Sequence, residues 1–152
     1  MVSILFVCHG NICRSPMAEF VMKDIVSRSG RDDVIIESCA TSTEELGNDI
    51  YPPVKAELRR RGIPFESRCA RQMRVSDYDR FDHIIAMDGQ NLRNLRRFVG
   101  DDPDGKVSLL MSFIGEDRGV DDPWYTGDFA RCFDEISAGC KSLAEKLGLK
   151  SG

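Results

Sequence analysis

The sequence predicts an α/β domain built on an open parallel sheet with helices on both faces. Short apolar runs alternate with amphipathic stretches along its 152 residues, as in parallel strands joined by helical crossovers. No linker-like or low-complexity stretch interrupts this alternation, so residues 1–152 are expected to form a single domain. Ligands of such sheets bind beyond the carboxyl ends of the strands.

The first predicted unit is a strand followed by a helix. Residues 2–7 form a short apolar run that ends at a Gly-containing turn, which indicates a buried strand. From Ser15 onward apolar residues recur three and four positions apart, and Gly30 offers a stop. We expect Ser15 to be the N-cap of this helix and Pro16 to occupy its first position.

The later elements follow the same alternation. Three further strands are expected at residues 34–38, 83–87 and 106–110. Helices are expected at residues 52–61, around residues 92–98, and from Phe129 to Leu147. The last helix has the clearest pattern, because a single apolar stripe runs along its whole length.

The segment between the first strand and the first helix, residues 8–15, reads Cys-His-Gly-Asn-Ile-Cys-Arg-Ser. A loop that leads into a helix start points several backbone N–H groups into one concavity, and the helix dipole adds positive potential there. This placement predicts a phosphate-binding loop that contains His9, Gly10, Asn11, Ile12 and Cys13.

Four side chains of this segment suit nucleophilic chemistry on a phosphate ester. A helix N-terminus and Arg14 favour the thiolate of Cys8, which attacks without a separate base. The planar fork of Arg14 fits two phosphoryl oxygens. Ser15 is placed to donate its hydroxyl to the sulfur, and Asn11 to hold the loop open. The Cys-x5-Arg spacing is weak evidence alone, so the prediction depends on its position between strand and helix.

Two other residues of the segment have more than one interpretation. His9 is expected to be a simple loop residue, because adjacent residues of a tight loop rarely face each other as a Cys–His pair does. Cys13 is either a packing residue or the partner of a reversible Cys8–Cys13 disulfide that protects the nucleophile from further oxidation.

The segment from Val7 to Glu19 resembles the signature of the low-molecular-weight protein tyrosine phosphatases. The resemblance implies a flavodoxin-like fold with a four-stranded parallel sheet, and a two-step hydrolysis that needs no metal or other cofactor. It continues in the family's order and spacing through Ser38 to Gly47, Ala86-Met87-Asp88 with Asn91-Leu92, and Asp122-Pro123-Trp124-Tyr125.

The resemblance also implies roles for individual residues. Cys8 attacks phosphorus, and Arg14 with the loop amides binds the transition state. Asp122 protonates the leaving phenolate and later activates water, as a carboxylic acid opposite the nucleophile can. Spacing alone does not separate Asp122 from Asp121; the family motif selects Asp122.

The walls of the substrate cleft include a departure from the family pattern. Trp124 and Tyr125 are expected to form an aromatic wall for a phosphotyrosine ring. Many members carry an aromatic residue on the second wall, where this chain has Glu44. An acidic side chain there removes a stacking surface and repels acidic peptides.

Three other functions fit the sequence less well than a tyrosine phosphatase does. Protein arginine phosphatases resemble this chain but place Thr where it has Ile12, whose branched side chain crowds a phosphoguanidinium group. An arsenate reductase of the same fold needs further cysteines in its second half, and residues 70–131 contain none. A phosphate-binding or phosphocysteine-carrier module expels no leaving group, so it would not need an acid such as Asp122 to protonate one.

Composition narrows the expected partners and compartment. A net charge of −4 and an isoelectric point near 5.2 argue against a nucleic-acid partner. The apolar start is too short to span a membrane, which leaves the cytoplasm, where six reduced cysteines are expected. Their spacing does not indicate a metal site. We expect a monomer that acts on phosphotyrosine-containing proteins or peptides.

Overall fold

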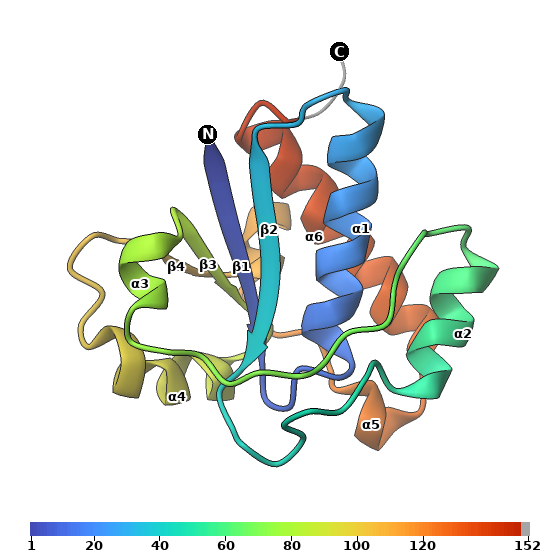
Figure 1. The fold of residues 1–152 in the computed structure, drawn as a ribbon, viewed down its shortest axis with the longest axis horizontal. Coiled ribbons are helices and arrows are strands. Elements are labelled where there is room, and N and C mark those ends of the chain that lie inside the picture. Colours follow the sequence, from blue (N-terminus) through green and yellow to red (C-terminus); the bar gives the residue numbers. More distant parts are fainter. Residues whose placement is uncertain (150–152) are drawn as a thin grey trace.

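A computed structural model describes residues 1–149 and contains a four-stranded, all-parallel sheet (Figure 1). Its strand order is β2-β1-β3-β4. The strands are β1 (Val2–Cys8), β2 (Val34–Ala40), β3 (His83–Ala86) and β4 (Val107–Leu109). The predicted fold class is therefore confirmed. The predicted domain limit at residue 152 lies outside the described residues.

Helices cover both faces of the sheet. Figure 1 shows α1 (Arg14–Arg28) and α6 (Phe129–Lys146) on one side of it, and α3 (Asp77–Arg80) and α4 (Gly89–Val99) on the other. Three further elements are α2 (Pro52–Arg60), which packs against α6, the 3-10 helix η1 (Leu110–Ile114), and the short α5 (Pro123–Thr126). No helix among residues 1–149 is both long and apolar enough to cross a membrane.

The central strand β1 divides the core in two. Ile4 and Phe6 belong to the apolar cluster under α1 and α6, whereas Leu5 and Val7 belong to the cluster under α4. All four side chains are fully buried. A strand that is buried on both faces reads as a continuous apolar run, which is why residues 2–7 lack polar alternation.

The strand order determines where the site lies. From β1 the sheet continues to β2 on one side and to β3 on the other, so the point where the order reverses lies between β1 and β3. Cys8 ends β1, and Asp88 follows shortly after the end of β3. The loops that leave these two strands therefore meet at the edge where open α/β sheets bind ligands.

The start of α1 differs from the prediction. The helix begins at Arg14 with Cys13 as its N-cap, and no side chain caps it. Ser15 and Pro16 are thus the second and third helical residues, and the prediction that Ser15 caps the helix is wrong. The physical reason is that the Ser15 hydroxyl is engaged with Cys8 and Asn11 instead.

Other boundaries also shift. β2 runs on to Ala40, while β4 stops at Leu109, because the chain turns there into η1. The first residue of η1 packs closely on α6, where a Cβ at Gly139 would lie 2.6 Å from the Leu110 Cγ. α4 begins at Gly89, ahead of its apolar pattern, because Asp88 and Asn91 form a reciprocal capping box.

Candidate active site

The thiol of Cys8 lies at the centre of the loop that follows β1. Its Sγ accepts the backbone N–H groups of Asn11, at 3.3 Å, and of Ser15, at 3.4 Å. The Ser15 Oγ lies 3.0 Å from the same sulfur. Either of these two groups can be the donor of this contact, and the Ser15 hydroxyl also lies 3.4 Å from the Cys39 carbonyl, to which it can donate. Two N–H donors and one hydroxyl group therefore surround a sulfur atom whose residue is only 3% exposed.

The side chain of Asn11 holds the loop from the inside. The residue is buried and adopts a left-handed conformation with φ of 59°, which is uncommon for a residue other than glycine. Its Nδ2 donates to the Ser15 Oγ at 2.8 Å and to the Ser38 Oγ at 2.9 Å. Ser38 in turn donates to Glu19 at 2.5 Å. The loop is thus tied to both α1 and β2.

The guanidinium of Arg14 is buried beside the same pocket and is fixed by two segments distant in sequence. Nη1 donates to the Asp88 Oδ2 at 2.6 Å and to the Val120 carbonyl at 2.9 Å. Nη2 lies 3.5 Å from the Asp122 Oδ2. Burial acts to lower the pKa of Arg14, but the charges of Cys8, Asp122 and Asp88 outweigh it and raise that pKa. Arg14 is therefore a permanent cation.

The segment that carries Asp122 passes very close to the end of β3. A Cβ at Gly119 would lie 2.5 Å from the Asp88 Cβ, so only glycine allows this approach. The Val120 N–H then donates to the Met87 carbonyl at 2.7 Å. Two residues later the Asp122 carboxylate caps α5 by accepting the Trp124 N–H at 3.1 Å. The approach at Gly119 brings Asp122 over the loop.

The structure separates the two adjacent carboxylates. Asp122 lines the pocket that contains Cys8, whereas Asp121 is exposed and lines a different hollow with Cys132 and Glu135. The pocket with Cys8 has a volume of about 120 Å³. Its lining residues are Cys8, His9, Gly10, Ile12, Cys13, Arg14, Glu44, Glu45, Asp122, Trp124 and Tyr125.

The aromatic wall lies at the mouth of this pocket. Trp124 is 50% exposed and Tyr125 is 83% exposed. Tyr51 supports Trp124, with ring centroids 4.7 Å apart, and its N–H donates to the Ile12 carbonyl at 3.0 Å. Sequence analysis missed Tyr51, because no local pattern connects it to the pocket.

Glu44 lies where the second wall was expected. Its Oε2 is 2.8 Å from the His9 Nε2, so the two side chains meet at the pocket mouth. His9 therefore faces Glu44, in accord with its interpretation as a loop residue. Glu45 lines the pocket as well, although the sequence analysis did not single it out.

Cys13 is a buried free thiol at the start of α1. Burial, reinforced by the charge of nearby Cys8, raises the pKa of Cys13 far above its usual range. The Cys13 thiol is therefore protonated at neutral pH. This burial agrees with a packing role for Cys13, and its redox role stays a prediction.

Asp88 is the main site residue that sequence reasoning did not assign. It joins the cap of α4 to the guanidinium of Arg14. Its position directly after a predicted strand could have indicated this, because the carboxyl ends of neighbouring parallel strands share one edge. Among residues 1–149, no three His, Cys, Asp or Glu side chains gather into a group that could hold a metal.

Comparisons with known proteins place this geometry in a family. The family model for low molecular weight phosphotyrosine protein phosphatase matches residues 3–151. The sequence is 38% identical over 150 residues to the low molecular weight protein-tyrosine-phosphatase YfkJ of Bacillus subtilis, covering 97% of this chain and 96% of that protein.

Solved structures agree with the sequence comparisons. The crystal structure of YfkJ has a TM-score of 0.93, with 97% and 95% of the two chains covered, at 37% identity. SP-PTP from Streptococcus pyogenes is 42% identical, with a TM-score of 0.87 and coverages of 97% and 93%. The Drosophila arginine phosphatase DARP is 29% identical, with a TM-score of 0.87 and coverages of 95% and 96%. This chain belongs to the low molecular weight phosphotyrosine protein phosphatase family.

Proposed function

We propose that this protein is a protein tyrosine phosphatase, which hydrolyses phosphotyrosine and small aryl phosphates through a cysteinyl-phosphate intermediate. The observation that supports it most is the meeting of Cys8, Arg14 and Asp122 around one pocket, with the Asp122 Oδ2 3.5 Å from the Arg14 Nη2. A nucleophile, a cation for the phosphoryl group and a carboxyl group for the leaving oxygen thus share one small volume.

In the first step the Cys8 thiolate attacks phosphorus. The bond between phosphorus and the phenolic oxygen breaks as the P–S bond forms. Asp122 gives its proton to the leaving oxygen, so that phenol departs and Asp122 becomes a carboxylate. Arg14 and the N–H groups of the loop stabilise the equatorial oxygens, where negative charge is spread in the transition state.

In the second step water attacks the phosphorus of the cysteinyl phosphate. Asp122 takes a proton from this water, and the P–S bond breaks to release inorganic phosphate and the Cys8 thiolate. The two N–H groups on Sγ stabilise the departing thiolate, and the adjacent Ser15 hydroxyl is placed to donate to it as well. The enzyme returns to its starting protonation state, and this route uses no metal or cofactor.

Phosphotyrosine is the favoured substrate over phosphoarginine. The branched side chain of Ile12 lines the pocket and crowds the space around a phosphoguanidinium group. The half-exposed Trp124 ring offers a stacking surface to a phenyl ring. DARP shares the fold, so overall similarity does not decide this point.

A comparison of kcat/KM on peptides that carry phosphotyrosine, phosphoserine or phosphoarginine tests the proposed substrate. We expect phosphotyrosine to be preferred strongly over both others. A preference for phosphoarginine would contradict the argument from Ile12 and Trp124. Absence of turnover on any phosphomonoester would favour a phosphate-binding module instead.

We further propose that Cys13 protects the nucleophile. Peroxide oxidises the Cys8 thiolate to a sulfenic acid; the Cys13 sulfur then attacks the Cys8 sulfur as its proton passes to the leaving hydroxide, so that water departs and a disulfide results. Peroxide should therefore inactivate the enzyme, and an added thiol should restore it. Wild-type protein that lost activity irreversibly, at the same rate as a Cys13→Ser variant, would contradict this.

We also propose that the protein works as a cytoplasmic monomer on phosphotyrosine-containing proteins. A reducing compartment keeps the Cys8 thiol available for attack. Sedimentation across a range of protein concentrations tests the monomer, since a dimer would raise the apparent mass as concentration increases.

A further inference from the structure

Asn11 is the most constrained residue of the phosphate loop. Its N–H donates to the Cys8 Sγ, while its backbone adopts the left-handed conformation described above. A residue with a Cβ stays in that region only when its surroundings over-determine it. Ser15 and Ser38 bind its Nδ2, and the remaining polar groups of Asn11 are its Oδ1 and its carbonyl.

One segment, residues 68–77, occupies both of these remaining groups. The Arg71 backbone N–H donates to the Asn11 Oδ1 at 3.2 Å. The Arg68 guanidinium donates through Nη2 to the Asn11 carbonyl, and through Nη1 to the Asn48 carbonyl at 3.3 Å. The loop is therefore held by this segment as well as by α1 and β2.

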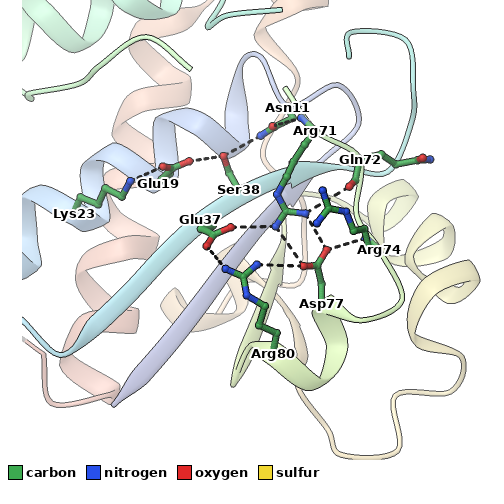
Figure 2. A network of polar contacts seen from close by, with 10 residues as sticks. All are labelled: Asn11, Glu19, Lys23, Glu37, Ser38, Arg71, Gln72, Arg74, Asp77 and Arg80. Atoms are coloured by element: carbon green, nitrogen blue, oxygen red, sulfur yellow. Dashed lines mark hydrogen bonds and ion pairs between the residues drawn. The ribbon is translucent and has the colours of Figure 1, made fainter. Parts of the chain in front are cut away.

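The segment is itself anchored on the sheet. Figure 2 shows Asn11 between Ser38 and Arg71, with the Arg71 guanidinium turned toward Glu37 and Asp77. Arg71 Nη1 lies 2.9 Å from the buried Asp77 carboxylate. The Ala40 N–H at the end of β2 also donates to the Arg71 carbonyl at 2.7 Å. These contacts fix the backbone from which Arg68 extends.

Arg68 differs from Arg14 and Arg71, the other two arginines discussed near the loop, because no carboxylate in the described part of the chain is paired with its guanidinium. Arg14 faces Asp88 and Asp122, and Arg71 faces Asp77 and Glu37. Within residues 1–149, by contrast, no carboxylate oxygen lies within 4.0 Å of the Arg68 guanidinium. Its contacts are two neutral carbonyls.

The charge of Arg68 is therefore not cancelled by direct contact. Burial lowers the pKa of Arg68, while the negative charges of Glu19, Cys8 and Asp49 act in the opposite direction. The Asp49 carboxylate accepts the backbone N–H of Arg68 at 3.0 Å and is paired with Lys55. Arg68 does not line the pocket, so its charge acts on the thiolate through the protein and not through contact with substrate. Electrostatic effects are larger in such a half-buried position than in water.

We propose that Arg68 is a positioning residue for the proposed phosphatase chemistry. It holds the Asn11 carbonyl so that the N–H of the same residue stays on the Cys8 Sγ, and it adds a positive charge that favours the thiolate. This inference rests on the proposed function, but it concerns the state of Cys8 and can be measured without turnover.

The test is the rate at which iodoacetate, an anionic reagent that attacks thiolates, inactivates the protein at about pH 6. A Cys69→Ser background removes the exposed thiol that would also react. Arg68→Met should slow alkylation of Cys8 about tenfold and lower kcat on para-nitrophenyl phosphate in proportion, as expected for loss of one charged hydrogen bond. Mass spectrometry identifies the alkylated cysteine.

Two further variants separate charge from packing. Arg68→Lys keeps the charge and should recover most of the alkylation rate, whereas Arg59→Met removes an exposed arginine of α2 and should behave like the background. If Arg68→Met proves unfolded, Arg68→Gln serves in its place. Alkylation of Arg68→Met at the background rate would overturn the proposal, and so would an Arg68→Lys variant as slow as Arg68→Met. If the protein lacked phosphatase activity, the alkylation rates would still show whether Arg68 increases the reactivity of Cys8.

Discussion

The floor and the rim of the pocket are built in opposite ways. On the floor, Cys8 is 3% exposed and Arg14 is 2% exposed. Asn11, which bonds to Cys8 but does not line the pocket, is 1% exposed, and contacts from other segments of the chain hold all three residues. On the rim, Trp124 is 50% exposed and Tyr125 is 83% exposed. The floor is thus fixed by buried polar contacts that tolerate little change.

This difference suggests a division of labour. The phosphoryl group is the same in every substrate, and a rigid floor can be pre-organised for it. The rest of the substrate varies, and exposed side chains on the rim can be exchanged at low cost in stability. Changes to the floor should therefore affect catalysis by large factors, and changes to the rim should affect preference among substrates by small ones.

The largest effects are expected on the floor. Cys8→Ser removes the nucleophile, and Arg14→Ala removes the cation that binds the phosphoryl oxygens, so each should abolish measurable turnover of para-nitrophenyl phosphate. Circular dichroism checks that each variant is folded. Activity within tenfold of wild type in either variant would show that the assigned floor does not carry the chemistry.

Asp122, between floor and rim, should have an intermediate effect. Asp122→Ala removes the proposed acid and base and should lower kcat on aryl phosphates by roughly 10² to 10⁴. Asp121→Ala is the matched control, because it removes an adjacent carboxylate that faces another hollow. The assignment is wrong if Asp121→Ala proves the more damaging of the two.

The smallest effect is expected on the rim. Glu44→Gln removes a charge that faces the substrate, so it should raise kcat/KM for a phosphotyrosine peptide with acidic flanks by about two- to fivefold relative to a basic one, as for an exposed charge pair. The change should shrink at high salt, because exposed charges are screened. If the ratio of kcat/KM for the two peptides stays the same in Glu44→Gln, Glu44 does not contribute to the preference between them.

The residues of the pocket floor could be predicted from the sequence better than the contacts that hold them in place. The strand, the loop and the helix start are contiguous in the sequence, so a local pattern could predict them, and Cys8 and Arg14 line the pocket at the end of β1 as that pattern indicated. The contacts that fix Arg14 come from Asp88 and Val120, more than seventy and a hundred residues away. No local pattern encodes such a meeting.

One local feature was predicted wrongly, and another was not predicted. Ser15-Pro16 reads as a helix start by propensity, but the Ser15 hydroxyl is used by Cys8 and Asn11, and tertiary contacts outweighed the capping preference. The short α5 is four residues long, too short for a periodic pattern, although Asp122 before Pro123 has the residue types of a helix start.

The central claim is that Cys8 carries the phosphoryl group during turnover. Rapid acid quenching of the enzyme with an aryl phosphate, followed by mass spectrometry of its peptides, tests it directly. We expect one phosphoryl group on the peptide that contains Cys8, and none in Cys8→Ser. A phosphoryl group on another residue, or turnover by Cys8→Ser, would contradict the account.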